Sequence, residues 1–191
     1  EMAISLEVTK EQVATFKQLH LLTAKKMFFV ANIDEDQLAD LDNPNQHLKS
    51  LKDYASDNGY EVVVICAQIE SEISQLSDDE AVMFLDELGL SERGLNKVIN
   101  MGYASLNLQT YFTAGPKEVR AWTIPVGASA PQAAGKIHTD FEKGFIRAEV
   151  ISYDDYVAYN GESGAKDAGK WRLEGKTYIV QDGDVMHFRF A

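Results

Sequence analysis

Two apolar runs of strand length, with a helix pattern between them, constrain the fold of this chain most strongly. Residues 26–31 and 61–65 are largely apolar, and the second run is rich in β-branched side chains. Such runs are typical of parallel strands that are covered on both faces. Residues 47–58 favour a helix that ends at Gly59. Strand, helix and strand within about 40 residues predict a βαβ unit with a right-handed crossover.

The first run ends in Asn32, Ile33, Asp34 and Glu35, an Asn-x-x-Glu pattern. This pattern resembles the base-reading loop of P-loop NTPases, where GTPases carry Asn-Lys-x-Asp. The Asp carboxylate of that motif accepts hydrogen bonds from N1–H and the 2-amino group of guanine, and adenine offers neither donor. Because Glu35 is one methylene longer than Asp and Ile33 replaces the Lys, we do not expect this loop to select guanine. On the local pattern alone, a strand end followed by a polar turn is the commoner explanation.

Longer motifs further along the chain favour the base-reading loop over a plain strand end and turn. They occupy residues 64–73, 94–99, 108–115, 118–124, 130–141 and 178–188. In this order they closely resemble the Obg-related YchF-type ATPases, and the resemblance runs from about Leu19 to the last residue. The motifs of the second half are long and specific, which makes a chance match untenable.

The resemblance implies an α/β fold in which part of a P-loop NTPase (Rossmann-like) parallel sheet is followed by a β-grasp domain of the TGS type. Residues 1–22 would be the tail of an inserted helical domain. Residues 23–105 would be the C-terminal part of the nucleotide-binding domain, and residues 106–191 the TGS domain. TGS domains also occur in some tRNA synthetases and stringent-response enzymes.

The phosphate loop of such ATPases, G-x-x-x-x-G-K-[ST], does not occur in these 191 residues. The Mg²⁺ ligands of the family belong to that same missing part. We therefore expect the chain to be the C-terminal part of a longer ATPase that binds ATP, Mg²⁺ and ribosomes. Because phosphoryl transfer depends on the phosphate loop and the metal, the chain alone should not hydrolyse ATP. No catalytic residue and no metal ligand is predicted within it.

The resemblance assigns the base pocket to Asn32, Ile33 and Glu35 and to the pair Cys66 and Ala67. The amide of Asn32 would meet the adenine edge, and Ile33 would offer backbone groups and an apolar contact. Glu35 would hold the loop and deter guanine. Cys66 and Ala67 occupy the place of a Ser-Ala loop whose backbone amides meet the base. A free cysteine is most often a buried apolar residue, and a redox role would require an exposed thiol of lowered pKa.

A basic surface is predicted on the TGS-like part. Its candidate RNA contacts are Lys117, Arg120, Lys136, Lys143 and Arg147. Four aromatic residues could join them, namely Tyr111, Phe112, Trp122 and Phe145. The alternative is a β-grasp core with the aromatic rings inside and ordinary solvated basic residues outside, and for the rings we favour it.

The charge is divided unevenly along the chain. The net charge is −12, of which residues 1–105 carry −11 and residues 106–191 carry −1. The first part should repel nucleic acid, DNA included, whereas the second could approach ribosomal RNA. One cysteine, no secretory signal and no apolar run of about 18 residues favour a cytoplasmic protein without a membrane segment. A stand-alone RNA- or protein-binding TGS module remains the alternative function.

Further elements are expected from local signals. Helices are predicted at residues 6–20, 67–75, 78–88, 95–104, 130–136 and 154–159, and strands at 108–114, 118–124, 144–152, 177–180 and 185–190. The last two strands should form a hairpin around residues 181–184. The four histidines, His20, His47, His138 and His187, are scattered and indicate no metal site.

The strand at residues 26–31 should have one unpaired edge, because its inner neighbour in the family's sheet would come from the missing part. Open apolar edges recruit other chains. We therefore expect the chain to self-associate through this edge, while residues 106–191 alone stay monomeric.

Overall fold

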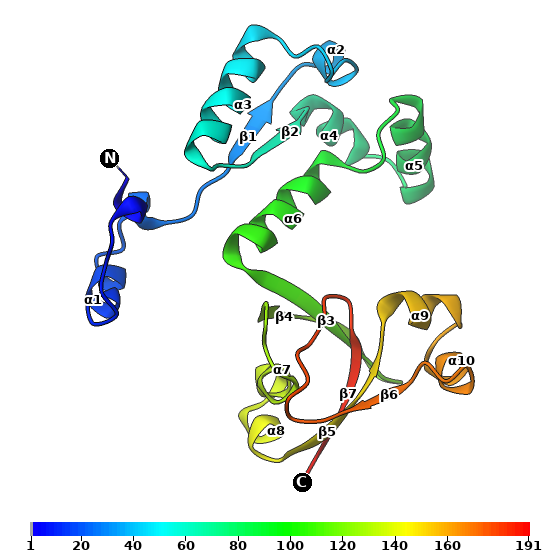
Figure 1. Ribbon diagram of the computed structural model, residues 1–191. Helices are drawn as coiled ribbons and strands as arrows, with labels where there is room; N and C mark the ends of the chain where they lie inside the picture. The colour runs from blue at the N-terminus through cyan, green and yellow to red at the C-terminus, as the bar shows by residue number, and fades with distance from the viewer. Residues whose placement is uncertain (1) are drawn as a thin grey trace. The chain divides into compact units, whose positions relative to one another are not determined.

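The computed structural model describes residues 2–191, which divide into two compact units. The first unit ends at Leu106, and the second runs from Asn107 to Ala191. Figure 1 shows the helices and strands of both units.

The first unit is built on two parallel strands. Strand β1 (Phe29–Asn32) pairs with β2 (Val62–Ile65), with Asn32 opposite Ile65 at the carboxyl ends. Helix α3 (Gln46–Asn58) connects the two strands. Its first turn is capped by the Asn45 side chain, which accepts a hydrogen bond from the Leu48 N–H at 2.8 Å. Gly59 ends the helix at φ 69°, the left-handed conformation that glycine adopts without strain. The predicted strand–helix–strand unit is therefore present.

Further helical segments complete the described part of the first unit. They are the 3₁₀ turns η1 (Ala3–Ser5) and η2 (Leu22–Ala24) and the helices α1 (Val13–Gln18), α2 (Glu35–Leu38), α4 (Ala67–Ile73), α5 (Asp78–Glu87) and α6 (Gly94–Leu106). Helix α5 begins with the capping box of Ser77 and Glu80. Cys66, Ile69, Ile73 and Ala81 form a small buried cluster under α4 and α5.

The helix expected at residues 6–20 is much shorter than predicted, because only α1 forms there. An apolar stripe of Val13, Phe16, Leu19 and Leu22 favoured the longer helix. Val13 and Phe16 are half-buried, but Leu19 is 58% and Leu22 81% exposed. Short helices in water depend on burying an apolar face. Leu19 and Leu22 have no such surface within the described part of the first unit.

The second unit is a five-stranded mixed sheet in the order β4-β3-β7-β5-β6. The strands are β3 (Leu108–Ala114), β4 (Val119–Pro125), β5 (Phe145–Ile151), β6 (Arg172–Glu174) and β7 (Val185–Phe190). Strand β3 is antiparallel to β4 and parallel to β7, and β5 is antiparallel to both β7 and β6. Its helices are α7 (Ala130–Ile137), α8 (Thr139–Lys143), α9 (Tyr153–Ala158) and α10 (Glu162–Asp167).

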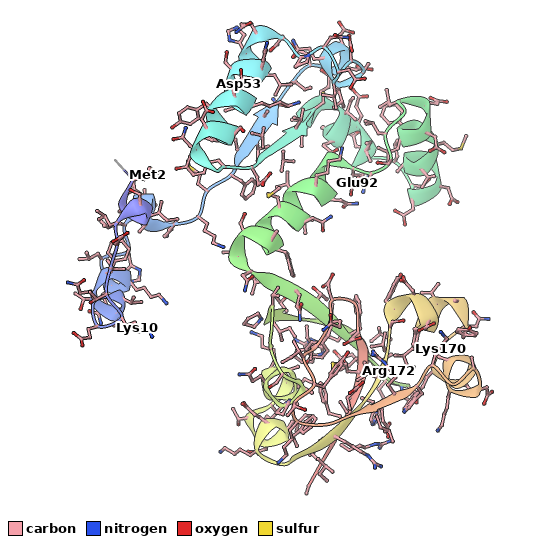
Figure 2. The ribbon with its side chains drawn as sticks, in the orientation of Figure 1. Met2, Lys10, Asp53, Glu92, Lys170 and Arg172 are labelled. Atoms are coloured by element: carbon pink, nitrogen blue, oxygen red, sulfur yellow. The ribbon has the colours of Figure 1, made fainter. Side chains whose placement is uncertain are left out.

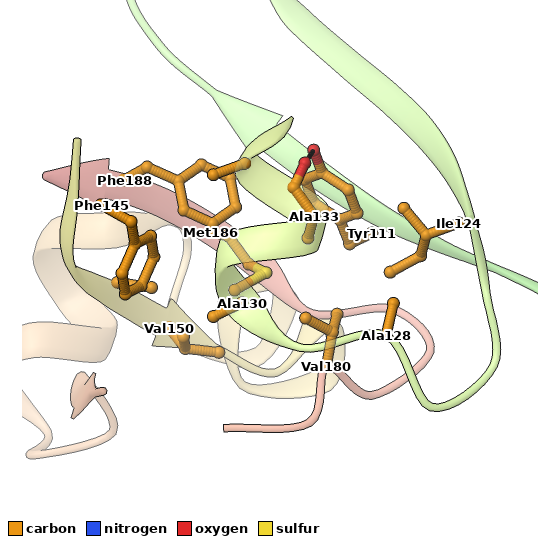
Figure 3. Close-up of a cluster of buried hydrophobic side chains, with 12 residues drawn as sticks. Tyr111, Ile124, Ala128, Ala130, Ala133, Phe145, Val150, Val180, Met186 and Phe188 are labelled. Carbon is orange, nitrogen blue, oxygen red and sulfur yellow. Dashed lines mark hydrogen bonds between the residues drawn. The ribbon is translucent and has the colours of Figure 1, made fainter. Parts of the chain in front are cut away.

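Helix α7 packs against one face of this sheet and supplies much of the core (Figure 3). Ala130, Ala133 and Ala134 are fully buried, and small side chains let the helix approach the strands closely. The fully buried Tyr111 donates a hydrogen bond from its hydroxyl to the Ala133 carbonyl at 2.8 Å. A mixed sheet that wraps one helix is the β-grasp arrangement predicted from the sequence.

The predicted hairpin of residues 177–180 and 185–190 is wrong. Residues 177–180 make one isolated bridge, between Ile179 and Ser129, and β7 pairs with β5 and β3 instead. The buried Asp184 carboxylate draws the segment into a turn, because it accepts hydrogen bonds from Tyr178 Oη at 2.7 Å and Gln181 N at 2.9 Å. Helices α8 and α10 and strand β6 were not predicted. None of the helices among residues 2–191 is both long and apolar enough to cross a bilayer.

Candidate functional site

The predicted base-pocket residues meet where β1 and β2 end. Asn32 is the last residue of β1, and its Oδ1 accepts a hydrogen bond from the Ala67 N–H at 2.9 Å, just beyond β2. The Ile33 N–H donates to the Ile65 carbonyl at 2.9 Å, which extends the strand pairing by one step. The carboxyl ends of parallel strands are where open α/β sheets bind ligands. One side chain thus ties together two loops at the edge that such sheets use for binding.

The Asn32 side chain has two hydrogen-bonding groups. Its Oδ1 acceptor is used, whereas its Nδ2 donor is not used among residues 2–191. Its Oδ1 is fixed as the acceptor by the Ala67 N–H, so the Nδ2 group lies on the other side of the amide. Among residues 2–191, Nδ2 donates no hydrogen bond, and the side chain is exposed. An amide donor held in this way can meet an acceptor nitrogen on the edge of a purine.

Ile33 and Glu35 flank the same loop. Ile33 is half-buried, and its backbone N–H is already used by Ile65, so it offers its side chain and its carbonyl rather than its N–H. Glu35 is the first residue of α2 and is exposed. Its carboxylate makes no hydrogen bond or ion pair within the described chain. The sequence led us to expect that Glu35 would hold the loop in place, but among residues 2–191 its carboxylate makes no contact of that kind.

Cys66 and Ala67 differ in what they can contribute. The Cys66 side chain is 4% exposed and packs in the cluster with Ile69 and Ile73. Its thiol faces the core, which favours the inert structural interpretation over a redox role. The Ala67 N–H is committed to Asn32, so this amide positions the loop instead of pointing at a base.

A hollow of about 250 Å³ adjoins Asn32 on the side of α3. It is lined by the ends of β1, by the short helix α2 and by the start of α3. Asn32 and Ile33 lie in its wall, whereas Glu35, Cys66 and Ala67 do not. Asn45 and His47 also border it, and sequence reasoning had assigned them no role. The helix-capping position of Asn45 was the one available signal that this residue lies at a helix start beside the strand end.

No group of three or more His, Cys, Asp or Glu side chains among residues 2–191 could hold a metal ion. His138 caps α8, because its Nδ1 accepts a hydrogen bond from the Asp140 N–H at 3.2 Å. His138 therefore has a structural role at the start of α8.

The five predicted RNA contacts are all exposed, but they come from separate parts of the second unit. Lys117 lies in the turn between β3 and β4, and Lys136 and Lys143 lie at the ends of α7 and α8. Arg120 stacks over the Trp122 ring at 4.2 Å from the ring centroid. Arg147 stands opposite Arg189 on β7 and next to the buried Ala148 of β5. Side chains alternate between the faces of a strand, so Arg147 lies on the sheet face away from α7.

The predicted aromatic partners are mostly interior. Tyr111 and Phe145 are 0% and 3% exposed and belong to the core, and Trp122 packs against it. Phe112, next to Tyr111 on β3, is half-buried and lies on the opposite face of the sheet. The rings therefore stabilise the β-grasp unit, as the alternative interpretation had it.

Comparisons with known proteins agree on one family. Residues 108–191 match the family YchF-GTPase_C, whose description is "protein of unknown function". Over 99% of its length the chain is 58% identical to a Pasteurella multocida protein named ribosome-binding ATPase YchF. A Bacillus subtilis protein of the same name is 55% identical over 98% of the chain.

The solved structure of the Schizosaccharomyces pombe YchF GTPase matches 97% of this chain and 49% of its own, with a TM-score of 0.78 and 34% identity. The chain spans about half the length of the curated relatives it matches, at 51% of each of the two proteins above. The predicted family and fold are therefore confirmed. This chain belongs to the YchF family.

Proposed function

We propose that this chain supplies part of the adenine pocket and the TGS domain of a ribosome-associated ATPase. The observation that carries the proposal is the hydrogen bond from the Ala67 N–H to Asn32 Oδ1. It joins the loops after two parallel strands and leaves the Asn32 Nδ2 donor free for the base. ATP and Mg²⁺ would supply the reacting phosphate and its charge neutralisation, and the residues that hold them would lie outside this chain. Residues 23–105 would then be nucleotide-binding, after a helical tail at residues 1–22.

The preference for adenine over guanine is inferred from the two guanine-selecting residues, Lys and Asp, that this loop lacks. A guanine-selecting loop pairs an aspartate with two donors of the base, and a site built that way rejects a base without those donors by a factor of about 10⁴. Here Ile33 stands in place of the lysine of that motif, and the longer Glu35 is exposed. We expect ATP to be preferred over GTP for these reasons.

The test uses the proposed longer ATPase that would contain this chain. Competition between ATP and GTP for a fluorescent nucleotide should favour ATP. Ile33→Lys combined with Glu35→Asp should move the preference towards GTP, and Asn32→Ala should weaken both nucleotides. A matched control is Ile99→Lys with Glu87→Asp, which makes the same exchanges at exposed positions of α6 and α5. If the unmutated protein preferred GTP, the assignment of residues 32–35 would be wrong.

Ribosome association is proposed from the names of the relatives and from the charge division. The second unit is near neutral, with exposed Lys136 and Lys143 at the ends of its helices. Contacts to ribosomal RNA phosphates weaken steeply with salt. Lys136→Glu with Lys143→Glu should therefore reduce co-sedimentation with ribosomes more than the control pair Lys166→Glu with Lys176→Glu. Sedimentation that stays unchanged between about 50 and 200 mM salt would argue against electrostatic docking.

A stand-alone binding module is the second candidate. Residues 107–191 form a compact unit with a buried core of their own, which is the observation in its favour. Ribosome or RNA binding by residues 107–191 alone, with no response to nucleotide in the longer protein, would support it over the first proposal.

A further inference from the structure

Another hollow, of about 360 Å³, lies on the second unit, and its walls carry both aromatic rings and carboxylates. Phe112 comes from β3, and Tyr153 and Asp154 come from the start of α9. Asp182 and Gly183 come from the loop before β7. Three segments that are distant in sequence thus converge on one concave surface.

The wall before β7 is held firmly against β3. Asp182 Oδ1 accepts a hydrogen bond from the Thr110 N–H at 2.8 Å, and the Gly183 N–H donates to the Thr110 carbonyl at 2.8 Å. The Phe112 N–H donates to the Asp184 carbonyl at 2.8 Å. Gly183 has φ 81°, which favours glycine at this turn. These bonds fix the positions of the wall before any ligand arrives, and such preorganisation lowers the cost of binding.

Two carboxylates next to the hollow already have cationic partners. Asp155 pairs with Lys170 at 3.4 Å, and Asp184 pairs with Arg172 at 3.5 Å. Lys170 and Arg172 are labelled in Figure 2. Lys170 is thus engaged with Asp155, and Arg172 with Asp184 and, at 3.9 Å, with Glu174.

The two carboxylates in the wall of the hollow, those of Asp154 and Asp182, are different. Among residues 2–191, neither makes an ion pair, and both side chains are exposed. The rings of Phe112 and Tyr153 lie beside them, with centroids 5.9 Å apart and planes inclined by 38°. Tyr153 is 53% exposed. Ring faces attract lysine and arginine cations, and the attraction adds to that of the carboxylates.

We propose that this hollow binds a lysine or arginine side chain of a basic protein segment. The ammonium or guanidinium would lie between the two carboxylates, and its aliphatic stem would cover the rings. Nucleic acid is disfavoured as the occupant, because the unpaired carboxylates repel phosphates. This inference concerns the surface of the second unit and rests on neither the nucleotide nor the ribosome proposal.

The test uses the full chain and a hexalysine peptide. Titration followed by NMR should shift the backbone amide signals of Phe112, Tyr153 and Gly183 most. Asp154→Asn combined with Asp182→Asn should weaken hexalysine binding roughly fivefold, because two exposed ion pairs are lost. Asn at position 182 keeps an amide oxygen to accept the Thr110 N–H, so the loop stays attached.

A matched control separates this site from the general acidity of the chain. Asp140→Asn with Asp167→Asn removes the same charge from α8 and α10 of the same unit and should weaken binding less than twofold. Equal weakening by both pairs would overturn the proposal, since net charge would then explain the binding. Shifts concentrated in the acidic first unit would also overturn it. So would hexauridylate that shifts the same amide signals in the unmutated chain, because the hollow would then be a nucleic-acid site.

Discussion

Replacing Tyr111 with Phe should destabilise the second unit at neutral pH and stabilise it relative to the unmutated chain in alkali. Tyr111 is fully buried, and its hydroxyl donates to the Ala133 carbonyl at 2.8 Å (Figure 3). A neutral buried hydrogen bond contributes about 1 kcal/mol net to the free energy of unfolding. The loss should lower the melting temperature by roughly 4–8 °C for a unit of this size.

The alkaline reversal follows from proton linkage. Burial raises the pKa of Tyr111 well above its ordinary value of 10.0. The folded state therefore keeps the proton while the unfolded chain releases it, and stability is lost as pH rises above about 10. One group of this kind lowers the free energy of unfolding by up to 1.36 kcal/mol per pH unit. The advantage of about 1 kcal/mol that the unmutated chain has over Tyr111→Phe at neutral pH therefore disappears near pH 10.6. Burial and the hydrogen bond to Asp184 raise the pKa of Tyr178 to about 12. Tyr178 is present in both proteins, and its contribution cancels in the difference.

Tryptophan fluorescence during urea unfolding measures this difference directly, because both tryptophans, Trp122 and Trp171, lie in the second unit. Tyr159→Phe removes a partly exposed hydroxyl and should change the neutral-pH free energy of unfolding by less than about 0.5 kcal/mol. The reasoning is refuted if Tyr111→Phe is as stable as the unmutated chain at pH 7, or if the two stability curves stay parallel above pH 10.

Two further predictions concern the first unit. Among residues 2–191, β1 pairs with β2 alone, and Val30 is 45% exposed, so the full chain should self-associate through the open edge at high micromolar concentration, as light scattering would detect. Val30→Lys should reduce that association, residues 107–191 alone should be monomeric, and a monodisperse monomer of the full chain would contradict the idea. Asn45→Ala should lower the stability of the first unit by about 1 kcal/mol in circular dichroism of urea unfolding, because the Leu48 N–H loses its acceptor. Asp53→Ala in the middle of α3 is the control, and an equal effect of both substitutions would count against a capping role.

Elements with local signals could be predicted from the sequence. Gly59 ends α3 as predicted, and α5 begins at Asp78 as predicted, after the capping box of Ser77 and Glu80. The hydrogen bonds of these signals join residues within a few positions of one another, so sequence spacing captures them. The two strands were predicted because each is apolar along its whole length, as burial on two faces requires.

Elements that depend on distant contacts were not predictable. Residues 177–180 look like a strand but are held by Ala128 and Ala130, whose backbones bond to Val180 and Tyr178 about fifty residues away. In the candidate site, too, the features set by local pattern could be predicted and those set by distant contacts could not. Asn32 could be placed at a strand end by pattern, but its engagement of the Ala67 N–H, and the burial of the Cys66 thiol beneath α4 and α5, arise from packing that no local spacing encodes.

The geometry that holds Asn32 depends only on the strand–helix–strand unit itself. The Ile33 N–H bonds to Ile65, and Asn32 bonds to Ala67, so both links join the end of β1 to the end of β2. Neither link requires further strands on the open edge of β1. The proposed adenine contact is therefore fixed by residues of one local unit. It follows that base choice should respond to substitutions within residues 32–35 even though the groups proposed to handle the phosphates lie elsewhere.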